Sequence, residues 1–239
     1  MTLLAAPTFP PLLKGEAVAA RVDPLQKAIS AALKGAEPGR LVYAEDESAL
    51  RAAITLVPDV SLADGMGALL AVELGFADAL GALAPPEVAV HFVWPDRIKV
   101  NGASCGTFRA AASTSEPEAE PDWLIVALDV PFTAELADPG RTPGTTTLAD
   151  EGCVEFGVVE LLESWSRHTL VWINRFVDEG FAPIHRAWNA KCDDLGEAIV
   201  YPQPGQFVGL DERGGLLLRD GAQTRLVPLT ALLDPSWHS

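Results

Sequence analysis

A short stretch of the chain combines residue types that suit a planar, anionic ligand. Residues 94–102 read Trp-Pro-Asp-Arg-Ile-Lys-Val-Asn-Gly, an aromatic ring, a rigid proline and two basic groups in one predicted β-hairpin. Trp94 could stack on a planar ligand, while Arg97, Lys99 or Arg109 could reach anionic groups. Arg97 and Lys99 lie two apart on one strand, so their side chains share a face. Spacing alone favours the alternative, a plain hairpin with a core tryptophan.

The other reactive side chains form no recognised catalytic pattern. No two histidines stand four residues apart, and none has a cysteine or carboxylate at metal-ligand spacing, so we predict no metal site. A GxSxG nucleophile motif and a Walker A loop are also missing. The acidic run at residues 45–47 is either a Mg²⁺ ligand set or a solvated turn, and in so acidic a chain the turn is favoured. The four histidines are His91, His168, His185 and His238.

Charge and composition exclude several classes of partner. The 239 residues carry 17 Lys+Arg against 33 Asp+Glu, so the formal net charge is 17 − 33 = −16. Such a chain repels phosphate backbones and anionic headgroups, which excludes nucleic acid and membrane surfaces. The most apolar stretch, residues 62–83, contains Asp64, Glu73 and Asp78 and is predicted to be a buried amphipathic helix rather than a membrane span. No targeting segment is visible, and three scattered cysteines suit a reducing cytoplasm.

The N-terminal part of the chain must position the hairpin. Residues 1–22 are predicted to be an extended lead-in, and Asp23 followed by Pro24 predicts a helix that ends near Leu33. The continuous apolar run 123–130 predicts a central strand buried on both faces. Asn101-Gly102 is a strong turn signal. The remaining predicted strands are residues 40–44, 51–57, 88–94, 97–101 and 106–111.

The C-terminal part shows one strong helical pattern and then a change to β structure. Apolar residues alternate four and three apart from Val158 to Phe176, which predicts a helix with one apolar stripe, and Gly180 lies just past its end. A shorter helix is predicted over 181–191. From residue 197 the chain shows short apolar runs between glycine turns, which predict a small all-β module. These runs are residues 198–201, 206–210, 215–219 and 224–228.

Several motifs, in order, resemble those of the biotin–protein ligase and lipoate–protein ligase family. Residues 91–106 resemble the family's catalytic hairpin, in which Trp-Pro-Asn-Asp is followed by an apolar strand, Asn/Asp-Gly and then Lys-x-x-Gly. Residues 147–152 are similar to its Ser-Leu-x-x-Glu-x-Gly loop. Residues 176–188 resemble its Phe-x-x-x-Gly-Phe…Leu…Trp segment, and residues 207–218 resemble a glycine-rich hairpin of its C-terminal module.

The resemblance implies a fold and a chemistry. The expected fold is α+β: a class II synthetase-like domain at residues 23–196, a mixed sheet with flanking helices, followed by an SH3-like β module at 197–239. The family uses ATP with Mg²⁺ to convert biotin or a related acid into an acyl-adenylate, and transfers the acyl group to a lysine of a carrier domain. The ligand-binding residues carried over are Trp94, Pro95, Asp96, Asn101, Gly102, Gly106 and Asp129.

The sequence departs from the family at the positions that bind phosphate and the acid. Residues 44–50 contain no Gly-Arg loop, and the lysine of Lys-x-x-Gly falls at Ala103 or Ser104. The family's Gly-x-Gly-x-Asn strand becomes Ile-Val-Ala-Leu-Asp at residues 125–129. We therefore expect a divergent member without the usual adenylation that binds a small acid or a carrier domain. The alternatives are an active ligase that uses Arg97, Lys99 or Arg109, and a non-catalytic structural or interaction protein.

Overall fold

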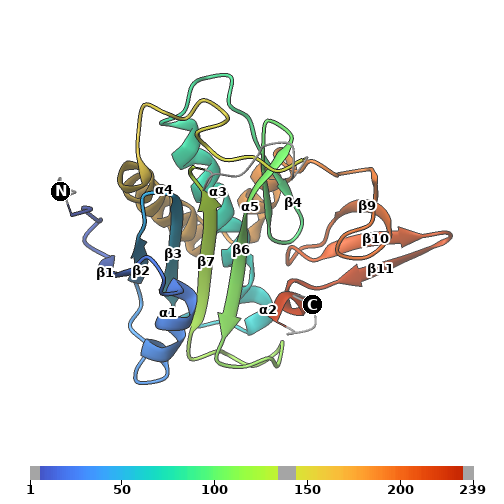
Figure 1. Cartoon of the computed structure of the whole chain (residues 1–239). Coiled ribbons are helices and arrows are strands. Elements are labelled where there is room, and N and C mark those ends of the chain that lie inside the picture. Colours follow the sequence, from blue (N-terminus) through green and yellow to red (C-terminus); the bar gives the residue numbers. More distant parts are fainter. Residues whose placement is uncertain (1–5, 134–143, 234–239) are drawn as a thin grey trace.

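The computed structural model describes residues 6–133 and 144–233, and a seven-stranded mixed sheet forms its centre (Figure 1). The strand order is β1-β2-β3-β7-β6-β5-β4, with β1 parallel to β2 and the other neighbours antiparallel. The strands are β1 (Lys14–Ala19), β2 (Arg40–Glu45), β3 (Ala49–Leu56), β4 (Val90–Val93), β5 (Arg97–Val100), β6 (Ala103–Ala112) and β7 (Leu124–Pro131). Part of the expected lead-in is thus the edge strand β1.

The centre of the sheet follows the sequence pattern closely. The apolar run forms β7, which pairs with β3 on one side and β6 on the other, and Ile125 and Val126 are both fully buried. The prediction of a central strand covered on both faces is confirmed. Asn101 and Gly102 form the turn between β5 and β6, with φ angles of 49° and 86°. Both angles lie in the left-handed region that asparagine and glycine tolerate best, so this predicted turn is confirmed.

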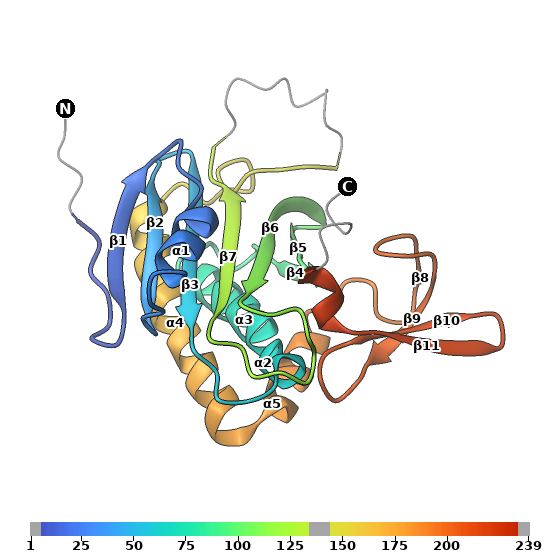
Figure 2. The ribbon, with the colours of Figure 1, turned by 90° about the horizontal axis from the view of Figure 1, so that it is seen from below.

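Helices cover the two faces of the sheet unequally (Figure 2). In the described part of the chain, one face carries a single helix, α1 (Pro24–Ala32), which begins where the Asp23 side chain accepts a hydrogen bond from Leu25 N–H at 3.0 Å. We call this the α1 face. The other face carries α3 (Gly67–Gly81), α4 (Val158–Glu179) and α5 (Phe181–Asn189) and holds the larger core. Trp165, on the predicted apolar stripe of α4, is fully buried there.

The segment at residues 62–83 differs from the single amphipathic helix that we predicted. It forms a short α2 (Leu62–Gly65) and a separate α3, and nearly every residue of α3 is buried, Glu73 included. α3 lies between the sheet and α4, so it is covered on all sides rather than on one stripe. A Cβ at Gly75 would lie 2.7 Å from Thr169 Cα, so only glycine allows α3 and α4 to pack this closely.

The C-terminal residues form a small antiparallel sheet beside the main domain (Figure 1). Its order is β11-β10-β9-β8, and a 3₁₀ turn at Leu229–Leu233 follows. The strands are β8 (Ala198–Ile199), β9 (Gly205–Leu210), β10 (Leu216–Asp220) and β11 (Gln223–Val227). Buried leucines such as Leu216 and Leu218 belong to the same core as α3 and α5, which attaches this sheet firmly to the larger domain.

None of the helices that the structure describes combines the length and the apolar character that crossing a bilayer would require.

Candidate ligand site at the hairpin and the α1 face

The hairpin that carries the family resemblance is packed against the C-terminal sheet. Trp94 is only 2% exposed, and its indole N–H donates to the carbonyl of Gly214 at 2.9 Å. Pro95 is buried beside it, after a cis peptide bond. Gly214 lies in the turn between β9 and β10, so the Trp94 ring joins the two domains. Its position therefore matches the core tryptophan of the plain-hairpin alternative.

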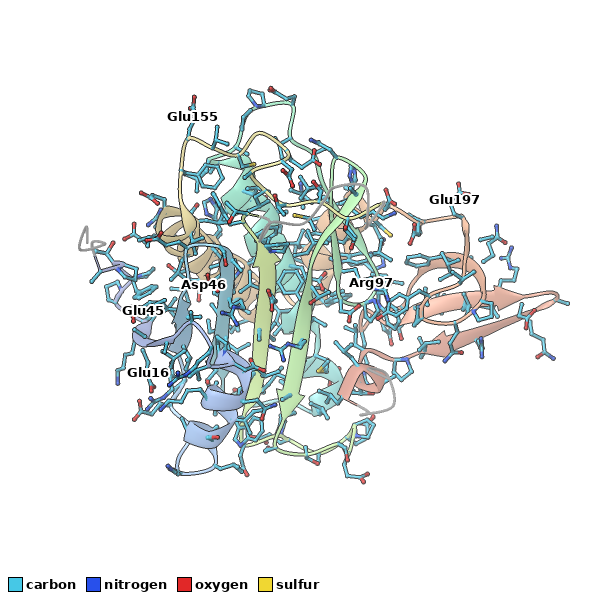
Figure 3. All side chains as sticks on the ribbon, viewed as in Figure 1. Glu16, Glu45, Asp46, Arg97, Glu155 and Glu197 are labelled. Carbon is cyan, nitrogen blue, oxygen red and sulfur yellow. The ribbon has the colours of Figure 1, made fainter. Side chains whose placement is uncertain are left out.

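The residues that follow Trp94 contact Tyr201, which the sequence analysis did not single out. Asp96 is buried and accepts a hydrogen bond from the Tyr201 hydroxyl at 2.8 Å. The guanidinium of Arg97 lies over the Tyr201 ring, 3.4 Å from its centroid, which is cation–π geometry. Burial, together with the nearby Asp96, raises the pKa of the Tyr201 hydroxyl. Figure 3 shows Arg97 between the hairpin and the C-terminal sheet.

Arg97 and Lys99 share one cavity, as their spacing on β5 predicts. This Arg97 cavity has a volume of about 270 Å³, and Ser104, Asp194 and Tyr201 also line it. The ammonium of Lys99 forms an ion pair with the carboxylate of Asp193, which comes from the segment after α5. The cavity therefore brings two cations together, but each already contacts an acidic or aromatic side chain of the protein.

The turn residues of the hairpin have structural partners. Asn101 Oδ1 accepts from the backbone N–H of Ala89 at 2.9 Å, and Asn101 Nδ2 donates to Glu151 at 2.7 Å. Glu151 belongs to the loop at 147–152 that the resemblance also includes, so the structure brings these two motifs together. Gly106 has a φ of 148°, and a Cβ there would lie 2.7 Å from the carbonyl oxygen of Asp129. Glycine is therefore required for β6 to approach β7.

Arg109, the third candidate cation, lies on the α1 face, separate from the Arg97 cavity. Its two terminal nitrogens each donate to a carboxylate oxygen of Asp23, both at 2.8 Å. Asp23 is also the cap of α1, so one carboxylate serves both the helix and the guanidinium. The Arg109 hydrogen bonds hold the pKa of Asp23 below its usual range. The sequence predicted the cap but not the pair with Arg109.

Asp129 completes a cluster of alternating charges on the α1 face. It pairs in register with Arg51 on β3 and Thr107 on β6. Burial raises the pKa of the Asp129 carboxyl, while the positive charges of Arg51 and Arg109 oppose that shift. Arg51 also donates to Asp46 at 2.6 Å, in the short connection where an active ligase would have its Gly-Arg loop. Asp46 (Figure 3) in turn accepts from the backbone and hydroxyl of Ser48, a turn rather than an open ligand set.

Side chains fill the sheet positions where the resemblance expects glycine. Ile125 is fully buried and Ala127 is 1% exposed, and both pack against Leu25 and Ala28 of α1. Together with the Asp23–Arg109 pair, they occupy the α1 face between the helix and the strands. A ligand ring lying flat on this part of the sheet would have to displace these packed side chains.

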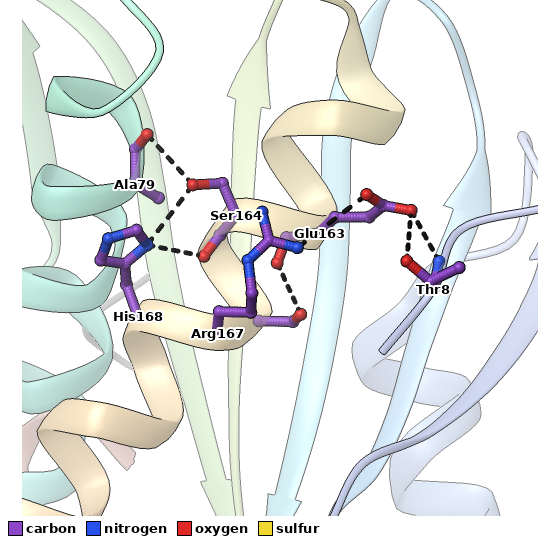
Figure 4. Close-up of polar contacts among 7 residues, drawn as sticks. Thr8, Ala79, Glu163, Ser164, Arg167 and His168 are labelled. Atoms are coloured by element: carbon purple, nitrogen blue, oxygen red, sulfur yellow. Dashed lines mark hydrogen bonds and ion pairs between the residues drawn. The ribbon is translucent and has the colours of Figure 1, made fainter. Parts of the chain in front are cut away.

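The one serine–histidine contact in the described residues is structural (Figure 4). Ser164 is buried on α4 and its hydroxyl lies 3.4 Å from both the Ala79 carbonyl and His168 Nδ1. The preceding residue, Glu163, accepts two hydrogen bonds from Thr8, at 2.7 and 2.9 Å. These contacts hold α3 and the N-terminal segment against α4. The described residues contain no group of three or more His, Cys, Asp or Glu side chains that could hold a metal ion.

Solved structures share this architecture. A biotin protein ligase-like protein of unknown function from Silicibacter sp. TM1040 superimposes with a TM-score of 0.90 at 46% identity, covering 96% of this chain and 100% of that one. The biotin protein ligase from Aquifex aeolicus gives a TM-score of 0.72 at 18% identity, with 90% of this chain and 96% of that chain covered. The chain therefore has a biotin-ligase-like fold with an added small antiparallel sheet.

Sequence comparison assigns the family. Residues 9–190 match the model of the biotin/lipoate A/B protein ligase family, and the chain belongs to that family. A biotin–[acetyl-CoA-carboxylase] ligase from Paracoccus denitrificans is 28% identical over 175 residues, which are 68% of this chain and 72% of the relative. Residues 195–235 match a second model, which describes a domain of unknown function. The family resemblance drawn from the motifs is thus confirmed.

Proposed function

We propose that this protein is a binding member of the ligase family that does not form biotinyl-adenylate at a ligase-like rate. One observation carries the proposal: each of the three candidate cations, in the Arg97 cavity or on the α1 face, already has a partner within the protein. Arg109 binds Asp23 through two hydrogen bonds, Lys99 pairs with Asp193, and Arg97 lies on the Tyr201 ring. Adenylation needs cations that neutralise phosphate charge as it develops, and these three are held by other groups.

The expected effect on rate is large. A hydrogen bond between a charged donor and phosphate contributes about 1.5–3 kcal/mol. In an active ligase of the expected kind, the Gly-Arg loop and the Lys-x-x-Gly lysine would supply several such bonds, and this chain has neither. If two such bonds act mainly in the transition state, their loss raises the barrier by about 3–6 kcal/mol, which is roughly a hundred- to ten-thousand-fold in rate. The filling of the α1 face by Ile125 supports the same conclusion for binding of biotin in a family-like pose.

Pyrophosphate exchange tests this proposal directly. The protein is incubated with ATP, Mg²⁺ and labelled pyrophosphate together with biotin, lipoate or octanoate, and the Aquifex aeolicus ligase serves as an active control. We expect exchange at least a hundred-fold slower than in the control. Exchange at the control's rate with any of these acids would refute the loss of adenylation.

A second candidate function is an active acyl-protein ligase with rearranged basic groups. The observation in its favour is that Arg97 and Lys99 line the same cavity, beside Ser104. If the exchange assay shows activity, Arg97→Ala and Lys99→Ala should each abolish most of it. Arg175→Ala removes a cation that pairs with Glu179 on the exposed side of α4 and is the matched control. Equal activity in all three variants would exclude this use of the cavity.

The ligand we propose is a small carboxylic acid or an acyl-carrier domain. The Paracoccus denitrificans relative is named for its action on acetyl-CoA carboxylase, which supports a carrier as partner. Calorimetric titration with biotin, lipoate, octanoate, ATP and an apo biotinyl carrier domain separates these possibilities. Binding of an acid or of the carrier without exchange activity is the expected pattern. No heat with any of the five would leave only a structural role and contradict the proposal.

The proposal also includes the domain division, the type of the C-terminal module and the location in the cell. The domain division near residue 196 is supported by the two family models, which match residues 9–190 and 195–235. The antiparallel order of β8 to β11 supports an SH3-like C-terminal module. We place the protein in the cytoplasm, and this is supported by Cys105, Cys153 and Cys192, all free thiols in the structure.

A further inference from the structure

A large cavity lies on the helical side of the sheet and shares no lining residue with the Arg97 cavity. Its volume is about 760 Å³, against about 270 Å³ for the Arg97 cavity. It is bounded by the connection after β3, by α2 and the start of α3, by the bend between α4 and α5, and by the β9–β10 turn of the C-terminal domain. We call it the α4–α5 cavity. Small-molecule sites usually have volumes of about 300–1,000 Å³, so its size suits such a ligand.

Apolar side chains make most of the wall. Phe176 and Phe181 meet edge to face across the bend at Gly180, with ring centroids 6.4 Å apart. Val57, Val60 and Val177 stand at the opening and are 45%, 43% and 76% exposed. Large apolar side chains exposed around one hollow are typical of a binding surface, because water contact there is unfavourable until a ligand covers them.

The two phenylalanine rings of the wall are packed tightly against the backbone behind them. A Cβ at Gly67 would lie 2.9 Å from the Phe176 ring, and a Cβ at Gly214 would lie 2.9 Å from the Phe181 ring. The two rings therefore rest directly on glycine backbone of α3 and of the C-terminal domain. Both domains hold the phenylalanines in place, and the cavity is a built feature rather than a loose gap.

The charged groups at the opening are mainly acidic. Arg213 is neutralised, because its Nε lies 2.9 Å from Asp64 and its Nη1 lies 3.4 Å from Glu118. Asp59 and Glu212 also line the cavity, and neither forms an ion pair among residues 6–133 and 144–233. The opening therefore carries excess negative charge, on a chain whose net charge is −16. Coulomb attraction favours a cationic ligand and disfavours an anionic one.

We propose that the α4–α5 cavity is a binding site for a small amphiphile with an apolar body and a cationic head group. The apolar body lies against Phe176, Phe181 and Val177, and the cationic group lies at the opening near Asp59 and Glu212. This site is separate from the hairpin, and it takes the opposite charge from the carboxylic acids proposed there.

Calorimetry with two probes of equal chain length tests the site. Decyltrimethylammonium and decanoate are each titrated, below their micelle concentrations, into the full-length protein. We expect decyltrimethylammonium to bind with a Kd of about 1 mM or tighter, and decanoate to bind at least ten-fold more weakly. Equal or tighter binding of decanoate, or no binding of decyltrimethylammonium, would overturn the proposal.

Matched variants locate the binding. Val177→Gln should weaken decyltrimethylammonium binding about ten-fold, since a polar group replaces a contact in the apolar wall. Val171→Gln, at a position that is 63% exposed on the same helix but outside this cavity, should leave binding unchanged. Because both valines are exposed, neither change threatens folding. Equal effects of the two substitutions would exclude the α4–α5 cavity as the site.

A second pair of variants tests the role of charge. The double variant Asp59→Asn/Glu212→Gln should reduce the preference for the cation over the anion by about five- to ten-fold. Glu155→Gln/Glu197→Gln removes the same charge from exposed positions elsewhere (Figure 3) and should keep the preference. If both double variants change the preference equally, only net charge matters and a specific cationic site is refuted.

Discussion

The hairpin region and the α4–α5 cavity differ in the pairing of their charged groups and in the exposure of their apolar side chains. At the hairpin and on the α1 face, cations are paired within the protein, as in Arg109 with Asp23, and the Trp94 ring is buried. At the α4–α5 cavity, Asp59 and Glu212 lack ion-pair partners among the described residues and valines such as Val177 are exposed. The cations of the region that resembles a ligase active site are therefore held by internal contacts, and the larger cavity lies elsewhere. The resemblance to the ligase family predicted a ligand site at the hairpin, whereas no motif predicted the α4–α5 cavity.

The largest effect on stability is expected on the buried apolar stripe of α4. Trp165→Ala should lower the free energy of unfolding by about 3–5 kcal/mol, because it removes a fully buried indole and leaves a void. Urea denaturation measures this loss. Val171→Ala, at an exposed position of the same helix, should change stability by less than about 0.5 kcal/mol. A loss under about 1 kcal/mol for Trp165→Ala would show that this face of α4 is not packed into the core.

The next effect tests whether Trp94 is core or ligand platform. Trp94→Phe should cost about 2 kcal/mol, since the Gly214 carbonyl loses its partner in a buried place. Trp165→Phe is the control, because the Trp165 indole N–H has no hydrogen-bond partner within the described residues, so only packing changes. Unfolding should show a larger loss for Trp94→Phe. If that variant instead kept full stability and lost binding of an acid, Trp94 would be part of a ligand site.

A smaller effect should come from opening the charge pair on the α1 face. Asp23→Ala removes both the α1 cap and the partner of Arg109, and should cost about 1–2 kcal/mol. Asp23→Asn keeps a capping oxygen and should cost about half as much. Because the pKa of Asp23 is lowered in the folded protein, its contribution is present at neutral pH and is lost as pH falls toward and below the usual value. A wild-type stability that did not fall with acid more than that of Asp23→Asn would contradict the pair's role.

The most subtle prediction concerns a buried acid beneath the hairpin. Glu73 on α3 is 1% exposed and accepts a hydrogen bond from the Trp188 indole, and its other carboxyl oxygen has no partner among residues 6–133 and 144–233. Burial raises the pKa of Glu73 well above the usual value of 4.5, and the negative charge of Asp96 adds to this. The folded protein therefore binds a proton that the unfolded chain releases above pH 4.5, so Glu73 lowers stability as pH rises.

Glu73→Gln should remove that pH dependence while keeping an oxygen for Trp188. The variant should gain stability relative to the wild type at pH values above the usual glutamate pKa of 4.5, with the gain growing as pH rises. Urea denaturation across this range measures the difference. Parallel curves for the two proteins would mean that Glu73 does not change its protonation on unfolding in this range.

Local patterns predicted much of the fold. The Asp23-Pro24 start of α1, the apolar run of β7, the stripe of α4 and the Asn101-Gly102 turn all appear in the structure at their predicted places. In two places the hydrophobic pattern did not predict the structure. Residues 62–83 were expected to form one amphipathic helix, but α3 is buried on nearly every side. A helix without a polar face has no amphipathic periodicity, so its sequence does not indicate which elements cover it. The strand β1 was missed because an edge strand with half-exposed residues has little apolar alternation.

The sequence alone determined the element types, the order of the motifs and the ligase-family resemblance, because capping, turn conformation and periodicity depend on neighbours a few residues away. Only the tertiary structure decided which polar groups meet. Arg109 finds Asp23 86 positions away, Asp96 binds Tyr201 105 positions away, and Glu73 binds Trp188 115 positions away. Each residue alone fits either a ligand site or the core. The choice depends on whether packing buries it beside a partner, because an unpaired buried charge is too costly to keep and a hydrogen-bonded one is tolerated.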